Sequence, residues 1–191
     1  MSDDSGAASS DISELLAQTL AESQRLGFLG SRPVAQVVAH ARYFVEALTA
    51  AGVPAHDVSI LDLGAGGGLP GLVIAHDLPG AQVTLLDRRQ TRTDFLARAV
   101  RRLQWNDRVV VLTQDAARPA GHQSASFDVA VARGFGPPAL TLGIATRWVR
   151  SGGHIAISEP PHGDRWAATD LAPLEVERCI SPAQVALFRR R

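Results

Sequence analysis

Residues 61–71 of the chain read LDLGAGGGLPG, and this stretch decides the fold. An apolar run that begins at Val58 leads into it, glycines stand at every second position from Gly64 to Gly68, and residues 72–75 are apolar again. Glycines let backbone N–H groups approach a ligand closely because they carry no Cβ. The stretch therefore predicts a strand, a ligand-binding loop and a helix start, the unit that holds phosphates or nucleosides in α/β folds.

The glycine spacing alone is compatible with two classes of cofactor. Gly66, Gly68 and Gly71 fit the G-x-G-x-x-G spacing of dinucleotide sites, although one more glycine, Gly64, precedes that match. The alternative is the loop of methyltransferases that use S-adenosylmethionine, in which an acid ends the strand before the glycines. Because the amino-acid end of that cofactor carries an ammonium, Asp62 has a charge to pair with. Asp62 favours S-adenosylmethionine over a nicotinamide cofactor; a purely structural glycine turn is the remaining alternative.

Strand and helix patterns alternate along the rest of the chain. We expect strands over 58–63, 82–86, 108–112, 127–132 and 154–158, and helices over 69–77, 90–103 and 140–149, with Gly152-Gly153 as a turn. This alternation predicts a parallel sheet with helices on both faces. Residues 176–180 and 185–188 are joined too closely for a crossover helix, so they should pair as an antiparallel hairpin. A mostly parallel seven-stranded sheet with this hairpin is the α/β arrangement of the Rossmann-like class I methyltransferases.

The N-terminal region predicts helices that belong to the same domain. Residues 1–10 are rich in Ser, Asp and Ala, so we expect a disordered tail. Asp11, with Glu14 three residues later, predicts the start of one amphipathic helix, and Pro33 suits the first turn of a second. We expect residues 11–52 to form a helical cap over the carboxyl edge of the sheet, within a single domain over 11–191.

Composition excludes several classes of protein. The 191 residues suit one domain, and no apolar run approaches the roughly 20 residues that span a bilayer. Without a secretory signal, we expect a cytoplasmic protein with no membrane partner. Cys179 should be a packed thiol, and six scattered histidines predict no metal site. Seven arginines between positions 88 and 108 face only two aspartates, which indicates either a nucleic-acid footprint or a solvated helix face.

Acidic residues stand at the tips of three successive predicted strands. Asp62, Asp87 and Asp115 should converge, because ligands in open α/β sheets bind outside the carboxyl ends of the strands. Asp87 suits both ribose hydroxyls since a carboxylate offers two acceptors, and Asp115 suits the adenine amine, with Ala116 supplying a backbone N–H. Each acid alone could be a helix cap or turn residue. Together they predict a nucleoside site.

These motifs resemble a known family. The loop at 62–71, LLD at 85–87, Arg92 followed by Phe95-Leu96, and FDVAVAR at 127–133 are similar to the small-subunit ribosomal RNA guanine-N7 methyltransferases, also called glucose-inhibited division protein B. The resemblance covers roughly residues 27–188. It implies transfer of a methyl group from S-adenosylmethionine to ribosomal RNA. The cofactor-binding residues that it implies are Asp62, Gly64, Ala65, Gly66, Gly68, Leu69, Pro70, Gly71, Asp87, Arg88, Asp115, Ala116 and Arg133, and the substrate residues are His40, Arg92 and Arg133.

The chain departs from the family pattern on the substrate side. Phe28-Leu29-Gly30 stands where Asn-Leu-Thr is usual, and Glu159-Pro160 replaces Lys-Gly. A small molecule or a protein is therefore an alternative acceptor, and a non-catalytic module that binds S-adenosylmethionine is another alternative function. The SEPP sequence at 158–161 resembles the acceptor motif of amino-group methyltransferases but follows the fifth strand instead of the fourth, so we expect a rigid rim there. Trp166 should be buried against the sheet.

Overall fold

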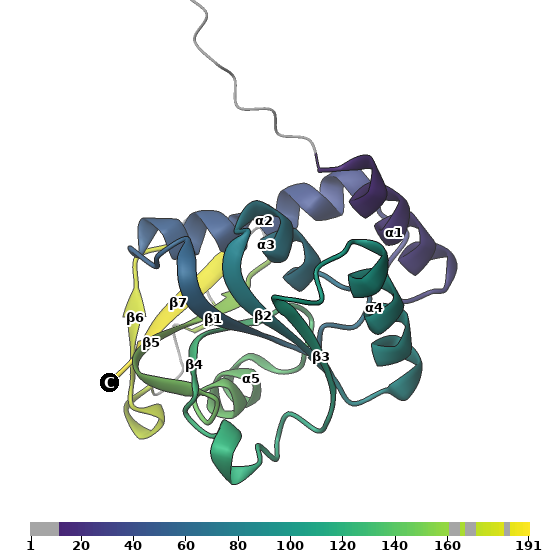
Figure 1. Cartoon of the computed structure of the whole chain (residues 1–191). Coiled ribbons are helices and arrows are strands. Elements are labelled where there is room, and N and C mark those ends of the chain that lie inside the picture. The colour runs from purple at the N-terminus through teal and green to yellow at the C-terminus, as the bar shows by residue number, and fades with distance from the viewer. Residues whose placement is uncertain (1–11, 161–164, 167–170, 182–183) are drawn as a thin grey trace, which may run out of the picture.

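Seven strands form one mixed sheet at the centre of the molecule (Figure 1). The computed structural model describes residues 12–160, 165–166, 171–181 and 184–191. The strands are β1 (His56–Leu63), β2 (Gly80–Asp87), β3 (Val109–Thr113), β4 (Phe127–Ala132), β5 (Val149–Ser158), β6 (Val176–Cys179) and β7 (Val185–Arg190), in the spatial order β3-β2-β1-β4-β5-β7-β6. Strands β1 to β5 are parallel, and β7 pairs antiparallel with both β5 and β6. The predicted fold class, including the C-terminal hairpin, is confirmed.

The parallel register brings the ends of the first four strands to one edge. Leu63 of β1 lies beside Leu86 of β2 and Ala132 of β4, and Asp87 lies beside Thr113 of β3. The segments that follow these strands therefore leave the sheet side by side. This edge holds the candidate site.

Helices cover the two faces of the sheet unequally in the described part of the chain. They are α1 (Glu14–Arg25), α2 (Val34–Ala50), α3 (Gly71–Asp77), α4 (Gln90–Arg102) and α5 (Pro138–Ala145), with short 3-10 turns at Gly121–Gln123 and Ala172–Leu174. Strand side chains alternate between the faces: Ile60 packs into the core that α1 to α4 cover, whereas Leu61 and Leu63 pack into the core beneath α5. Figure 1 shows α2 and α3 above the sheet and α5 below it.

The two N-terminal helices differ in position from the expected cap. Helix α2 contacts α3, β5 and β7, so it lies on a face of the sheet and not over its carboxyl edge. The reason is its apolar stripe, in which Val37, Ala41, Phe44 and Leu48 are all buried. Ser23 near the end of α1 and Leu29 in the connection to α2 reach the glycine loop.

That contact with the loop is specific. The buried Ser23 hydroxyl donates a 2.9 Å hydrogen bond to the carbonyl oxygen of Gly67. The Leu29 side chain packs so close to Gly67 that a Cβ at Gly67 would lie 2.6 Å from it. The N-terminal helices therefore support the outer side of the loop.

Three expected boundaries are wrong for local reasons. Helix α1 begins at Glu14, because the Ser13 hydroxyl caps it by accepting a 3.3 Å hydrogen bond from the Leu16 N–H. Asp11 and the expected tail over 1–10 lie outside the described residues. Helix α5 spans only residues 138–145, so β5 begins at 149 and contains both glycines of the expected turn. The register with β4 shifts there, and a Cβ at Gly153 would lie 2.5 Å from the Asp128 carbonyl oxygen. The glycines serve a bulge and not a turn.

Candidate functional site

The loop between β1 and α3 has a backbone that requires glycine. Gly64, Gly66 and Gly68 have φ values of +72°, +53° and +101°, in the region that side chains with a Cβ rarely adopt. Space is also short, because a Cβ on Gly64 would lie 2.7 Å from a Phe135 ring carbon and a Cβ on Gly66 would lie 2.7 Å from Arg92 Nη1. The Leu86 carbonyl oxygen of β2 accepts a 2.9 Å hydrogen bond from the loop N–H of residue 65. The loop is thus fixed against its neighbours.

Asp62 lies beneath this loop and is fully buried. Its Oδ2 accepts a 2.8 Å hydrogen bond from the Gly71 N–H at the start of α3, while Oδ1 has no hydrogen-bond partner among the described residues. Burial raises the pKa of Asp62 to about 7, against the opposing effects of the Gly71 N–H and the positive charge of Arg133. Since side chains alternate along β1, Asp62 points to the same face as Ile60, the face that α3 covers.

Asp87 connects the loop to the start of α4. Its Oδ2 accepts from the Gly66 N–H at 3.0 Å, and its Oδ1 accepts from the Arg89 N–H at 2.9 Å. The side chain is buried, with 6% of its surface exposed. Each carboxylate oxygen has more than one acceptor site, so both oxygens can still accept from a ligand.

A hollow of about 290 Å³ opens at the carboxyl ends of β1 to β4. Asp115 stands on its rim and accepts a 3.0 Å hydrogen bond from the Ala117 N–H. The neighbouring Ala116 carbonyl oxygen accepts from the buried Trp148 indole N–H at 2.7 Å, which fixes the backbone at this wall. The full lining consists of Gly64, Leu86, Asp87, Arg88, Arg89, Arg92, Gln114, Asp115, Ala116, Gly134, Phe135, Leu140 and Ile144. Acidic groups together with apolar side chains in one hollow suit a nucleoside.

The predicted site residues divide into three groups. Gly64, Asp87, Arg88, Arg92, Asp115 and Ala116 line the hollow. Ala65, Gly66, Gly68, Leu69, Pro70 and Gly71 form the loop behind it, where the Ala65 and Leu69 side chains are buried and only backbone can meet a ligand. Asp62, Arg133 and His40 do not line the hollow. The expectation that the three acids surround one shared space is therefore wrong for Asp62, which reaches the site from beneath the loop.

Arg133 and His40 belong to a second, basic group beside the hollow. Burial lowers the pKa of Arg133, and the nearby charge of Arg32 acts in the same direction. Burial also lowers the pKa of His40, together with the charge of Arg133. His40 Nδ1 lies 3.3 Å from the Gln184 Oε1 that precedes β7. The imidazole is therefore neutral at pH 7 and lies among positive charges.

Sequence reasoning missed the apolar part of the hollow. Phe135 follows Arg133 and lies over the glycine loop, and Leu140 and Ile144 of α5 form a further wall. The sequence carried one usable signal, because an aromatic residue between Gly134 and Gly136 directly after a strand indicates a ligand-facing position. The α5 residues had no such signal, since Leu140 and Ile144 lie inside the expected helix and nothing in the sequence shows that this face of the helix meets the hollow.

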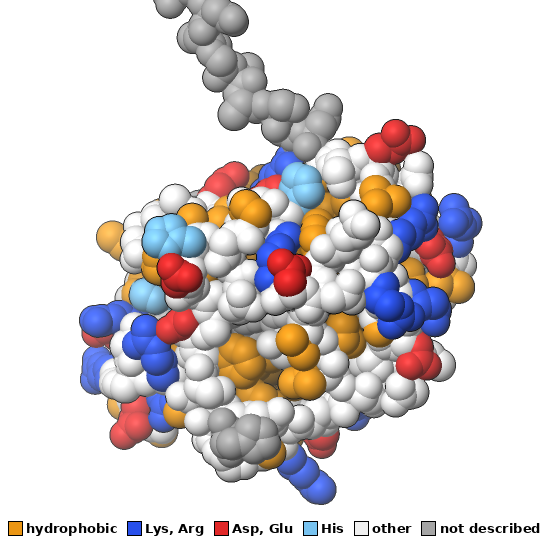
Figure 2. All heavy atoms as spheres, in the orientation of Figure 1, with side chains coloured by type: hydrophobic (Ala, Val, Ile, Leu, Met, Phe, Trp, Pro, Cys, Tyr) orange, Lys and Arg blue, Asp and Glu red, His pale blue; other side chains and the backbone are white. Residues whose placement is uncertain are grey.

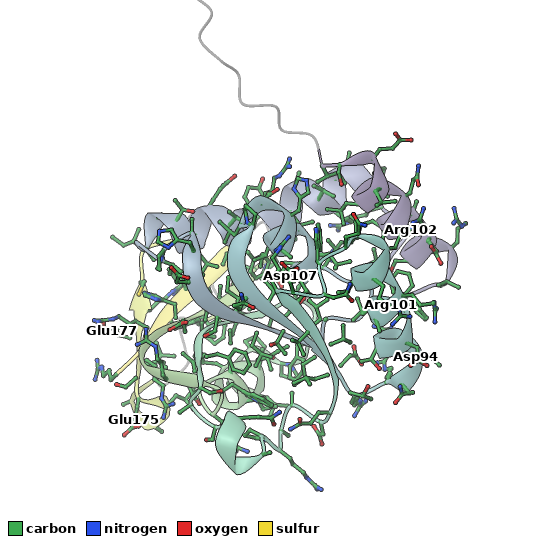
Figure 3. The ribbon with its side chains drawn as sticks, viewed as in Figure 1. Asp94, Arg101, Arg102, Asp107, Glu175 and Glu177 are labelled. Carbon is green, nitrogen blue, oxygen red and sulfur yellow. The ribbon has the colours of Figure 1, made fainter. Side chains whose placement is uncertain are left out.

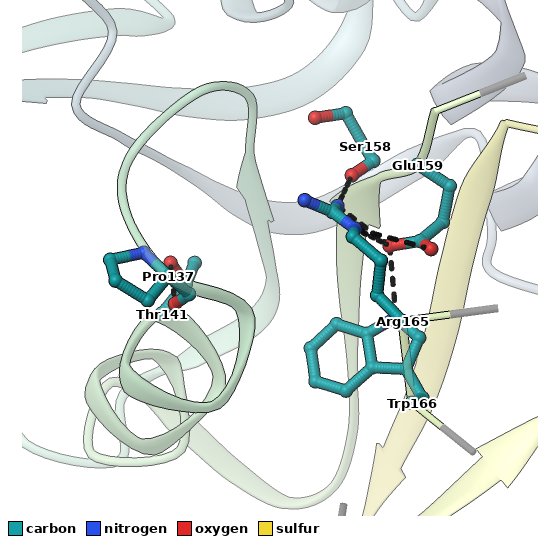
Figure 4. A network of polar contacts seen from close by, with 6 residues as sticks. All are labelled: Pro137, Thr141, Ser158, Glu159, Arg165 and Trp166. Atoms are coloured by element: carbon teal, nitrogen blue, oxygen red, sulfur yellow. Dashed lines mark hydrogen bonds and ion pairs between the residues drawn. The ribbon is translucent and has the colours of Figure 1, made fainter. Parts of the chain in front are cut away.

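A polar network closes the end of β5 (Figure 4). Glu159 accepts hydrogen bonds from Arg165 Nη2 at 2.8 Å and from the Trp166 indole N–H at 2.9 Å, and Arg165 also donates to the Ser158 carbonyl oxygen. Trp166 is 3% exposed and packs edge-on against the Phe188 ring at 4.7 Å between centroids. Its predicted burial is confirmed. Pro161, part of the expected rim, lies outside the described residues.

The arginines between positions 88 and 108 differ in their neighbours. Arg88, Arg89 and Arg92 line the hollow. Arg102 instead extends from the end of α4 towards α1, where it donates to Gln18 at 2.9 Å and to Glu22 at 3.4 Å. Figure 3 shows Arg101 and Arg102 on this outer side, and Figure 2 shows basic side chains gathered over α1 and α4.

Two negative findings apply to the described ranges. No helix there has the length and apolar character needed to cross a membrane. The same residues contain no group of three or more His, Cys, Asp or Glu side chains placed to hold a metal ion. Cys179 is a free thiol that packs against the core from β6, and burial raises its pKa.

Comparison with known proteins identifies the family. The model of the rRNA small subunit methyltransferase G family, GidB, matches residues 10–159. The chain belongs to this family. The GidB resemblance seen in the motifs is confirmed, and the matched range includes the glycine loop and the whole lining of the hollow.

Curated relatives carry the name of this family, and solved structures share the fold. The chain is 41% identical over 96 residues to ribosomal RNA small subunit methyltransferase G of Burkholderia thailandensis, covering 50% of this chain and 42% of that one. It is 34% identical over 131 residues to the Stenotrophomonas maltophilia protein of the same name, covering 63% and 59%. The chain thus spans about half the length of the curated relatives it matches. One similar solved structure is 1,6-didemethyltoxoflavin-N1-methyltransferase of B. thailandensis with bound S-adenosylhomocysteine. It has a TM-score of 0.62 and 19% sequence identity, over 92% of this chain and 87% of that one. This similarity shows a shared fold.

Proposed function

We propose that the chain binds S-adenosylmethionine in the hollow and transfers its methyl group to guanine N7 of small-subunit ribosomal RNA. The observation that carries this proposal is the hollow itself: Asp87 and Asp115 line it at the carboxyl ends of adjacent strands, beside the apolar side chains of Leu86 and Phe135, in a chain of the GidB family. The unpartnered Asp62 Oδ1 beneath the loop fits the ammonium of the cofactor, because a buried carboxylate oxygen is stabilised by a cationic donor.

The described residues suggest how the cofactor would be held. Asp87 would accept from both ribose hydroxyls, and Asp115 from the adenine amine, with the Ala116 backbone beside it. The bound cofactor supplies a methyl group on a positively charged sulfur, which makes that methyl electrophilic. Guanine N7 has a lone pair and no proton, so the chain needs no general base, and positioning with electrostatics is sufficient.

The substrate side favours an anionic acceptor. Arg32 and Arg133 form a basic group beside the hollow, and Arg133 has no hydrogen bond or ion pair among the described residues. Glu159, which replaces a basic residue of the family pattern, is paired with Arg165, so its charge does not oppose a phosphate. RNA binds to such groups with release of counterions and should therefore dissociate as salt is raised. A ribosomal substrate would place the protein in the cytoplasm.

The first test is methyl transfer to small ribosomal subunits from a strain that lacks this gene. With the purified chain and methyl-labelled cofactor, we expect label in 7-methylguanosine after nucleoside analysis. Label in a protein or small molecule of an extract would instead support the alternative acceptors. Cofactor binding without any transfer would support a non-catalytic module.

The second test separates cofactor binding from turnover. Asp87→Ala should weaken S-adenosylhomocysteine binding in calorimetry by roughly tenfold or more, since hydrogen bonds to a charged group are worth about 1.5–3 kcal/mol. Asp87→Asn keeps one acceptor oxygen and serves as the matched variant, with an intermediate loss. Unchanged affinity in both folded variants would refute the nucleoside site.

A further inference from the structure

Arg92, in the first turn of α4, lies over the glycine loop. Its Nη1 is 2.7 Å from the position that a Cβ on Gly66 would take, so the guanidinium is in contact with the loop backbone. Its Cζ also lies 5.7 Å from the centroid of the Phe28 ring, which itself packs edge-on against Phe95. The head group is therefore held between the loop and an aromatic pair.

The positive charge of Arg92 has no anionic partner among the described residues. The ion pairs of this part of the chain do not include it, and the neighbouring Asp94 accepts from Gln90 Nε2 at 2.8 Å instead. The cation–π contact with Phe28 uses none of the N–H groups of the guanidinium, and these have no hydrogen-bond acceptor among the described residues. A held, half-buried guanidinium with free donors is suited to a planar anion such as a carboxylate.

The site places this cation at one particular part of the ligand. The Gly66 N–H donates a hydrogen bond to Asp87, and Arg92 lies where a Cβ on Gly66 would point. Both side chains therefore flank the same loop residue. Asp87 and Arg92 also line the same hollow, so a ligand whose ribose rests on Asp87 has Arg92 within the same space. In S-adenosylmethionine this group is an amino acid, with one ammonium and one carboxylate.

On this basis, and resting on the proposed function, we propose that Arg92 binds the carboxylate of the amino-acid end of the cofactor. Asp62 beneath the loop and Arg92 above it then form a pair of opposite charges that matches the zwitterion. This assignment moves Arg92 from the substrate side, where the family resemblance placed it, to the cofactor. Arg88 and Arg89 are the exposed arginines of the rim and are better placed for RNA phosphates.

The test compares two ligands that differ only at this end of the molecule. S-adenosylhomocysteine carries the amino acid, whereas 5′-methylthioadenosine keeps the adenosine and lacks the carboxylate and ammonium. In calorimetry, Arg92→Gln should weaken S-adenosylhomocysteine between about tenfold and a hundredfold, as for a lost charge-assisted contact, and should leave 5′-methylthioadenosine unchanged. Arg92→Lys keeps the charge but not the fork, so it should recover part of the affinity. Arg101→Gln removes the same charge from the last turn of α4 and should change neither affinity.

The outcomes separate the possible roles. An equal loss for both ligands in the glutamine and lysine variants would mean that Arg92 only supports the loop, and it would overturn the proposal. Unchanged S-adenosylhomocysteine affinity with weaker RNA binding would also overturn it and return Arg92 to the substrate. If the unaltered chain binds neither ligand, the nucleoside site itself fails, which is a different result from failure at Arg92 alone.

Discussion

Replacement of Asp62 by asparagine should change how stability depends on pH. The carboxylate is buried and one oxygen has no partner, so its ionised form is costly, and burial raises its pKa from an ordinary 3.8 to about 7. Between these values the folded chain holds a proton that the unfolded chain has lost. Stability from this group is therefore complete below about pH 4 and is lost as the pH rises through 7.

The size of this effect follows from the two pKa values. The difference between 3.8 and about 7 corresponds to roughly 4 kcal/mol at about 1.4 kcal/mol per pKa unit. Roughly 2.5 kcal/mol of this loss should occur between about pH 5 and about pH 8, because the unfolded side chain is already ionised there. Asp62→Asn removes the ionisation, and its amide oxygen can still accept from the Gly71 N–H.

The assay is the free energy of unfolding from denaturant titrations at both pH values. The wild type should lose stability relative to Asp62→Asn as the pH rises. Asp128→Asn is the matched control. Burial acts to raise the pKa of Asp128, but the hydrogen bonds from Ser59 and Arg150 have the larger effect and hold this pKa below its ordinary value. Its contribution is lost only in acid, so that variant should follow the wild-type slope in this window. Parallel profiles of the wild type and Asp62→Asn would refute the reasoning.

Three further substitutions test the structure of the site. Gly64→Ala should lower the free energy of unfolding by about 2 to 4 kcal/mol in denaturant titrations, because alanine disfavours the positive φ and its Cβ would overpack against Phe135. Phe135→Ala in the same chain should restore part of the lost stability. Additive losses from the two substitutions would contradict this explanation. Trp148→Phe loses the hydrogen bond to the Ala116 carbonyl oxygen, so we expect the free energy of unfolding to fall by about 1 to 3 kcal/mol. Calorimetry should also show weaker binding of S-adenosylhomocysteine. Unchanged affinity would mean that the wall of the hollow at Ala116 does not meet the ligand. Ser23→Ala should cost about 1 kcal/mol and increase hydrogen exchange in the loop; unchanged exchange would show that the loop does not depend on α1.

The sheet was predictable because its signals are local. Apolar runs at 58–63 and 127–132 have the length and period of strands, and the glycines after β1 require a loop whatever else the chain does. Asp87 and Asp115 were also found, because a residue that ends a parallel strand is placed by the strand alone. These positions depend little on contacts between distant segments.

The errors arose where distant segments decide the outcome. The sequence places Asp62 at a strand end but does not show that α3 returns over its face, which buries the carboxylate. Arg102 looked like part of a basic patch because its partners, Gln18 and Glu22, precede it by eighty residues or more. Gly153 looked like a turn because the close approach of the β4 backbone is a tertiary contact. Whether the other predicted site residues bind the cofactor stays a prediction.

The order of the strands has one more consequence. Since β1 lies between β2 and β4, the chain winds outward to β3 on one side and, after returning, to β5 on the other. At this switch point the connections diverge. Asp87 and Asp115, the proposed nucleoside contacts, come from one half, and residues 133–137 and 159–160 come from the other. Under the proposed function, exchanges in the second half would therefore change the choice of acceptor and leave Asp87 and Asp115 intact.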